Sequence, residues 1–191
     1  MTDAHLPPPP AVPGDSKDWT WVLGRRCPEC RFDVRSFASS EVASLLRQVT
    51  NKWAELLGRH PEELRHRPSP EVWSPIEYAA HVRDVLALYS ERLELMMTED
   101  GPHYPDWDQN ATAIEKRYDQ SDPLDVRVAL SANGAKLASQ FDAVTGAGWE
   151  RTGFRSDGAA FTVESFARYL VHDPVHHLHD VGVTFVPRDS S

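Results

Sequence analysis

The sequence predicts an all-α protein, an up-down four-helix bundle with a long connection between its second and third helices. Apolar residues recur at helical spacing in four long segments, and a capping residue precedes each segment. Alternating strand patterns are weak, apart from a possible short strand at Trp19–Leu23. At 191 residues the chain is long enough for one domain with a full core and a short appendage.

Three parts are expected along the chain. Residues 1–37 hold a Pro-rich tail, to about residue 18, followed by a turn built on Cys27-Pro28-Glu29-Cys30. The bundle takes residues 38–186, and residues 187–191 form a second tail.

The first two helices are predicted from periodicity and capping. The second covers about residues 75–97, with Ser74 as N-cap, Pro75 at the first helical position, and Glu77 completing a capping box. The first covers about residues 39–58, and its apolar face consists of Val42, Leu45, Leu46, Val49, Trp53, Leu56 and Leu57.

The third helix follows a long link. Residues 102–121 are rich in aromatic and acidic side chains and are expected to hold a short helix around residues 111–118. The third long helix opens at Asp122-Pro123 and stops at Gly146.

The fourth helix follows a predicted loop over residues 149–161, and Thr162 is its expected N-cap. Pro174 lies inside this helix. Because proline removes a backbone hydrogen bond and clashes with the carbonyl four residues earlier, it should bend the helix or divide it into two.

Composition argues against two classes of partner. The net charge is −9 and the Lys and Arg residues are scattered, so no basic stripe is available for nucleic acid. No apolar run approaches the length of a membrane span, and the polar, Pro-rich N-terminus does not read as a signal peptide. A cytoplasmic location is expected, and a single Cys-x-x-Cys motif suits a reducing compartment.

The most informative segment is the histidine-rich run at residues 169–180. Two pairs in it have the i, i+4 spacing with which one helical face can bind a metal: His172 with His176, and Asp173 with His177. A helical wheel places Asp173 and His177 at the edge of the apolar stripe and the other pair roughly opposite. Asp173 and His177 are therefore predicted to be the buried ligands, since a buried carboxylate is costly without a cation. A shifted register would make the other pair the ligands.

A third ligand is expected from the second helix. His81 lies at the border of the apolar face of that helix. A lone histidine there is more often a packing residue, but bundles build metal sites from ligands on facing helices. His81, Asp173 and His177 are therefore the predicted metal ligands. Further candidates for contacts with these ligands or with substrate are Trp73, His176, His179 and Asp180.

The Trp-Ser-Pro-x-Glu-x-x-x-His run at residues 73–81, together with the ligand spacing on the last helix, resembles the DinB-like (YfiT-like) superfamily of four-helix metalloproteins. The resemblance covers about residues 38–185 and implies a divalent metal bound by three histidines. His81 and His177 match the first and last of them, and Asp173, itself a competent ligand, stands in the middle position. Zinc is the expected metal; nickel, iron and manganese also suit this ligand set.

The resemblance also implies an activity. Related members include transferases that use low-molecular-weight thiols such as mycothiol or bacillithiol. A metal with an open coordination position can lower the pKa of a thiol for attack on an electrophile. We therefore expect a metal-dependent thiol S-transferase, whose partners are a small-molecule thiol and an electrophile. The alternative is a non-catalytic metal-binding stress or partner-binding protein.

Cys27 and Cys30 supply half of a zinc-ribbon signature. Two more ligands would have to come from a second subunit or from histidines such as His60, His66 or His103. A redox-sensitive dithiol and a pair without special role are the alternatives. A homodimer is expected, because bundle relatives often dimerise and a symmetric interface could complete the site.

Overall fold

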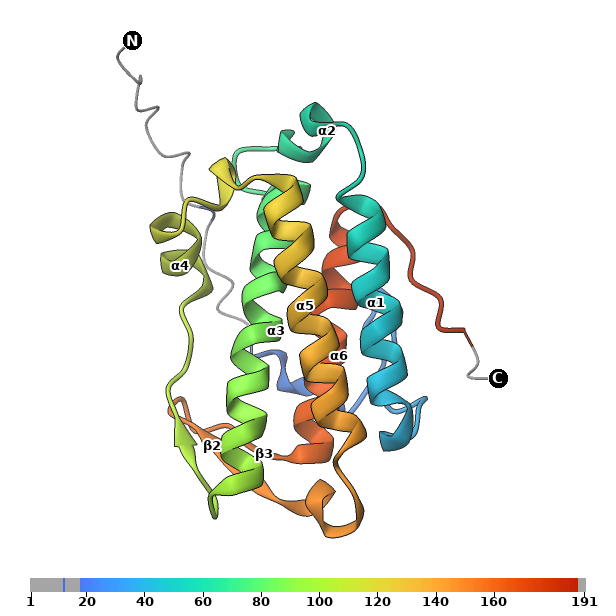
Figure 1. Ribbon diagram of the computed structural model, residues 1–191, viewed down its shortest axis with the longest axis vertical. Coiled ribbons are helices and arrows are strands. Elements are labelled where there is room, and N and C mark those ends of the chain that lie inside the picture. The colour runs from blue at the N-terminus through green and yellow to red at the C-terminus, as the bar shows by residue number, and fades with distance from the viewer. Residues whose placement is uncertain (1–11, 13–17, 189–191) are drawn as a thin grey trace.

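The computed structural model describes residue 12 and residues 18–188. The predicted Pro-rich tail therefore lies almost entirely outside the described residues. Within them, no helix combines the length and the apolar character needed to cross a membrane. Four long helices pack side by side (Figure 1), which confirms the predicted all-α four-helix bundle: α1 (Val42–Leu56), α3 (Pro75–Thr98), α5 (Pro123–Asp142) and α6 (Val163–Asp180).

The long connection sets the direction of the third long helix. Helices α1 and α6 run one way along the bundle and α3 and α5 run the other way (Figure 1). After α3 the chain returns along the bundle, through α4 (Gln109–Glu115) and the 3-10 helix η3 (Tyr118–Gln120). Asp84 of α3 holds this connection, because it accepts hydrogen bonds from the Tyr118 hydroxyl at 2.6 Å and the Lys116 ammonium at 2.9 Å.

Local capping signals begin α3, α5 and α6 where they are predicted to begin, whereas α1 begins at Val42, after the short 3-10 helix at Ser39–Glu41. The Glu77 carboxylate accepts hydrogen bonds from the backbone N–H and the hydroxyl of Ser74, at 2.9 and 2.7 Å. Thr162 accepts a hydrogen bond from the Ser165 N–H at 3.1 Å and caps α6. Helix α6 runs unbroken through Pro174, so this proline does not divide the segment into two helices.

A small sheet replaces the loop predicted over residues 149–161. Strand β2 (Thr152–Arg155) pairs antiparallel with β3 (Ala160–Thr162) and parallel with β1 (His103–Tyr104). Each strand has only two to four residues. Such short strands carry no readable alternation, and β1 lies about fifty residues before its partner, so the prediction of a loop was wrong.

The other short elements are helical. The prediction of a strand at Trp19–Leu23 was wrong, because these residues form the 3-10 helix η1. Asp18 caps this helix by accepting a hydrogen bond from the Thr20 N–H at 2.9 Å. The remaining short helices are η2 (Ser39–Glu41), α2 (Pro61–Arg65) and η4 (Gly146–Glu150).

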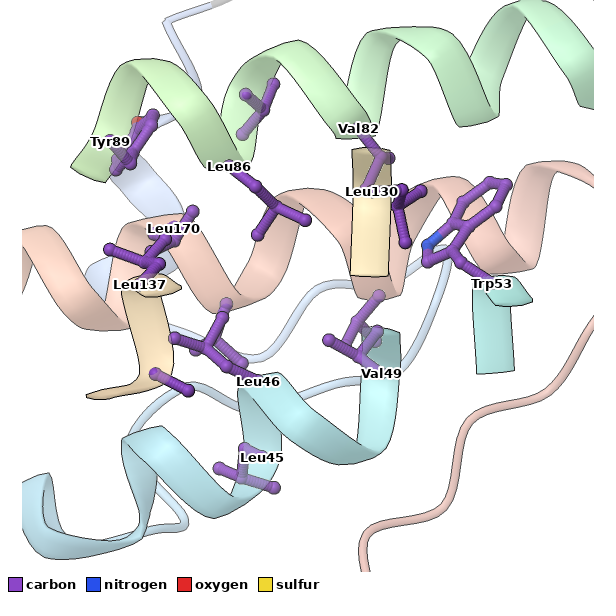
Figure 2. Packing of buried hydrophobic residues seen from close by; sticks show 14 of the residues in the cluster. Leu45, Leu46, Val49, Trp53, Val82, Leu86, Tyr89, Leu130, Leu137 and Leu170 are labelled. Carbon is purple, nitrogen blue, oxygen red and sulfur yellow. The ribbon is translucent and has the colours of Figure 1, made fainter. Parts of the chain in front are cut away.

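The core lies between the four long helices. Figure 2 shows Leu46 of α1, Leu86 of α3 and Leu170 of α6 directed into it, and all three are fully buried. Burying each such side chain is worth about 1.5–3 kcal/mol. Helices α1 and α5 approach closely at Gly134, where an added Cβ would lie 2.4 Å from Thr50 Oγ1. Glycine at this position lets the two helices pack.

Residues 18–37 cover one face of α6. Helix η1 contacts α6, and Val22 and Val34 of this segment are buried. The Arg168 guanidinium of α6 donates hydrogen bonds to the backbone carbonyls of Phe37, at 2.9 Å, and Val34. The N-terminal segment is therefore part of the packed structure.

Candidate metal centres

The three predicted ligands lie together where α3 meets α6. His81 Nε2 lies 3.5 Å from Asp173 Oδ1, and His177 Nε2 lies 3.8 Å from Asp173 Oδ2. One potential ligand atom from each residue lies within 4.8 Å of the others. The fold therefore brings together the three residues that the sequence pattern singled out; we call them the first group.

Buried atoms of the first group lack hydrogen-bond partners. The His81 side chain is 1% exposed, and among the described residues neither of its ring nitrogens has a hydrogen-bond partner. The same holds for Oδ1 of Asp173. Buried polar atoms are nearly always hydrogen-bonded, so the unsatisfied His81 Nε2 and Asp173 Oδ1, which face each other at 3.5 Å, fit a cation bound by both residues.

The charge states of this group also suit a cation. Burial lowers the pKa of His81, so its imidazole is neutral near pH 7 and keeps a lone pair. Burial opposes ionisation of Asp173, but its attraction to the His81 and His177 rings when they are protonated outweighs this effect and lowers the pKa of Asp173 to about 2. The group thus combines a carboxylate with neutral imidazole, the forms in which these side chains bind metals.

Asp180 orients His177. Its Oδ2 lies 2.8 Å from His177 Nδ1. Burial opposes ionisation of Asp180, but the hydrogen bond from His177 outweighs it and lowers the pKa of Asp180, so the carboxylate accepts and Nδ1 donates. The lone pair is left on Nε2, which faces Asp173, an arrangement common behind metal-ligating histidines. His179, another candidate contact from the sequence, is exposed.

Aromatic rings enclose the first group. Trp107 stacks on His81 with ring centres 5.4 Å apart, and Trp73 lies 5.5 Å from the same ring. Tyr78 packs against His177 with ring centres 4.9 Å apart. Trp107 comes from the long connection and was not among the predicted site residues. The one sequence feature that could have indicated a role for Trp107 is the aromatic content of residues 102–121.

A cavity of about 1030 Å³ borders the first group, and His81 and Asp173 are part of its wall. Arg92 and Arg155 line the same cavity. The Arg155 guanidinium pairs with Asp157 at 2.7 Å. Arg92 is buried, forms no ion pair with a described residue, and its Nε lacks a hydrogen-bond partner there. The Arg92 guanidinium donates a hydrogen bond to the Pro105 carbonyl at 2.6 Å and lies over the Tyr104 ring, and its Nε remains available to a ligand in the cavity.

The other histidine pair of α6 meets the Cys-x-x-Cys motif. Cys27 Sγ lies 3.7 Å from His176 Nδ1, and Cys30 Sγ lies 3.6 Å from His172 Nε2. One potential ligand atom from each of these four residues, the second group, lies within 4.8 Å of the others. The partners suggested from the sequence are not in this group: His60, His66 and His103.

The predicted burial of the two pairs was wrong. His172 and His176 are buried, whereas Asp173 and His177 are half-buried, with side chains 30% and 17% exposed. The helical wheel considered only the bundle core, and residues 18–37 cover the opposite face of α6. The two pairs are therefore not alternatives, since each faces its own set of possible ligands.

Comparison with known proteins identifies the family. The sequence profile of the DinB superfamily matches residues 43–181. The chain belongs to the DinB superfamily. YfiT from Bacillus subtilis has a similar structure, with a TM-score of 0.66 and 18% sequence identity. The match covers 75% of this chain and 86% of the YfiT chain. YfiT is described as a probable metal-dependent hydrolase with an unusual four-helix bundle topology. A search of curated proteins found no match.

The family match separates the two groups. His81, Asp173 and His177 all lie inside the region that matches the DinB superfamily, whereas Cys27 and Cys30 precede it. The second group is therefore built in part from residues outside the family match. It is also complete within one chain, which removes one of the two reasons for expecting a homodimer.

Proposed function

We propose that this DinB superfamily member is a metal-dependent thiol S-transferase. His81, Asp173 and His177 would hold its divalent metal, for which zinc is the first choice. The observation that carries the proposal is the juxtaposition of buried, unsatisfied ligand atoms with a cavity large enough for a substrate. Catalytic zinc sites commonly use three protein ligands and leave one position open. YfiT, which shares this fold, is described as a probable metal-dependent hydrolase, and this description supports metal dependence in the present chain.

The side chains around the group have distinct roles in this proposal. A divalent metal bound there supplies Lewis acidity, which lowers the pKa of a low-molecular-weight thiol such as mycothiol. Asp180 keeps the His177 ring in the orientation that directs Nε2 to Asp173. Trp73 and Trp107 exclude water from His81.

Arg92 suggests one feature of the substrates. Arg92 lines the cavity, and its buried Nε has no hydrogen-bond partner among the described residues. Guanidinium groups bind carboxylates through strong, oriented hydrogen bonds. A carboxylate on the thiol or on the electrophile would therefore be bound and oriented at this wall.

Turnover that depends on both metal and thiol tests the proposal. A fluorogenic, bimane-type electrophile is offered with a panel of thiols that includes mycothiol, bacillithiol and cysteine. We expect thiol-dependent consumption of the electrophile that a chelator abolishes, zinc restores and His81→Ala lacks. Metal binding without turnover across the panel would contradict the proposal and favour a non-catalytic metal-binding protein. Chelator-sensitive ester hydrolysis without added thiol would favour a hydrolase instead.

A further inference from the structure

We propose that Cys27, Cys30, His172 and His176 form a second metal site, a structural zinc site of the Cys2His2 type. The site would hold the N-terminal segment of residues 18–37 against α6. Such a site is separate from the first group and requires no catalytic activity.

The distances within the second group suit a tetrahedral zinc ion. Sulfur and nitrogen lie 3.7 Å apart in the Cys27–His176 pair and 3.6 Å apart in the Cys30–His172 pair. With Zn–S bonds of about 2.3 Å and Zn–N bonds of about 2.0 Å, tetrahedral geometry separates the two ligand atoms by about 3.5 Å. A single S–H to nitrogen hydrogen bond could give one such distance. The convergence of four ligand atoms within 4.8 Å favours a shared ion.

The spacing of the ligands in the chain supports the same assignment. Cys-x-x-Cys followed by His-x-x-x-His is the spacing of structural zinc sites, although here the two halves lie 142 residues apart. Arg31 takes the left-handed backbone conformation, with φ of 62°. This residue turns the chain back, so that the Cys27 N–H donates to the Phe32 carbonyl at 3.0 Å. The turn brings both sulfurs to the histidines.

Carboxylates lie behind one of the proposed ligands. His176 Nε2 is 3.4 Å from Glu29 Oε2 and 3.7 Å from Asp180 Oδ1. Acceptors on that side favour the tautomer with its proton on Nε2, which leaves the lone pair on Nδ1 facing Cys27. Glu29 lies between the two cysteines in the chain, so the motif supplies both ligands and a supporting carboxylate.

Most of the second group is buried, and its two histidines also line a cavity of about 210 Å³. Cys27, His172 and His176 are buried and Cys30 is half-buried. Trp19 covers the two histidines, with ring centres 5.7 Å from His172 and 4.9 Å from His176. Trp19 also lines the large cavity, so an ion here would fix part of the wall of that cavity.

Cobalt substitution reports thiolate ligation without reference to activity. The reduced chain is stripped with a chelator and titrated with Co²⁺. We expect thiolate-to-cobalt charge-transfer absorption that Zn²⁺ displaces, and both thiols should resist alkylation in the zinc-loaded protein. Cobalt binding without that absorption, or alkylation at equal rates with and without zinc, would overturn the proposal. A Cys27–Cys30 disulfide in metal-free, freshly purified protein would also overturn it, in favour of a redox pair.

Variants separate the two metal sites. Cys27→Ser/Cys30→Ser should bind one metal ion fewer per chain and lose the charge-transfer absorption. Asp173→Ala should lose the other ion and keep that absorption, so failure of one site is distinguishable from failure of the other. His179→Ala, which alters an exposed histidine of the same helix, is the matched control and should keep both ions. If the double cysteine variant does not fold, the cobalt spectrum of the unaltered chain still decides.

Discussion

His176 and His177 are consecutive in α6, yet their rings face two different sets of ligand atoms. His176 Nδ1 lies 3.7 Å from Cys27 Sγ, and His177 Nε2 lies 3.8 Å from Asp173 Oδ2. Successive helical residues point about 100° apart, so one helix can serve two sites. Asp180 contacts both rings, at 2.8 Å from His177 Nδ1 and 3.7 Å from His176 Nε2. The two groups therefore share one supporting carboxylate.

Replacement of this carboxylate should affect both groups. Asp180→Asn removes the charge that orients the two rings, and loss of such a partner commonly weakens metal binding by about 10–100-fold. We expect the larger loss at the first group, where the contact is shorter. Competition with a chromophoric chelator measures the metal affinity of each variant. His179→Ala is the control, and its metal affinity should equal that of the original chain. Unaltered affinity in Asp180→Asn would show that the carboxylate does not support the ligands.

Asp173→His should preserve or tighten metal binding at the first group. The resemblance to the DinB superfamily places a histidine at this position in relatives, and imidazole is a strong ligand for zinc. The same chelator competition applies, with Asp173→Ala as the variant that should lose the ion. Loss of metal from Asp173→His would mean that the site depends on a carboxylate.

Arg92→Gln tests the proposed carboxylate contact. A hydrogen bond to a charged group is worth about 1.5–3 kcal/mol, so the KM for a carboxylate-bearing substrate should rise by about 10-fold or more while kcat changes little. A neutral amide analogue of the same substrate is the control and should show no difference between the two proteins. Equal effects on both substrates would indicate that Arg92 acts through the shape of the cavity.

Gly134→Ala should destabilise the bundle. Alanine is favoured over glycine in a helix by about 1 kcal/mol, but the new Cβ would lie 2.4 Å from Thr50 Oγ1 and 2.7 Å from Thr50 Cγ2. Overpacking of this kind costs about 1–3 kcal/mol, so the free energy of unfolding in denaturant should fall.

Two controls accompany that measurement. Lys136→Ala changes an exposed residue of the same helix, and its free energy of unfolding should stay within about 0.5 kcal/mol of that of the original chain. Thr50→Ala removes the clashing atoms, so adding it to Gly134→Ala should recover stability. A Gly134→Ala variant as stable as the original would contradict the close packing of α1 and α5.

The parts of the structure that were predicted correctly depend on local signals. Ser74 with Glu77, and Thr162 before α6, mark helix starts within a few residues of sequence. The sheet and the second group depend on pairings that no local pattern records. Cys27 and His176, for example, are 149 residues apart. The burial of His176 was missed for the same reason, because the residues that cover it precede the bundle.

Metal content, combined with thiol protection, is the most direct test that His81, Asp173 and His177 hold a metal. Protein purified without added metal is analysed for its elements and for the rate at which its cysteines are alkylated. We expect Asp173→Ala to lose one ion per chain while both cysteines stay protected, and His172→Ala to lose one ion and to expose both cysteines to alkylation. Asp173→Ala protein with the full metal content of the original chain would contradict the assignment.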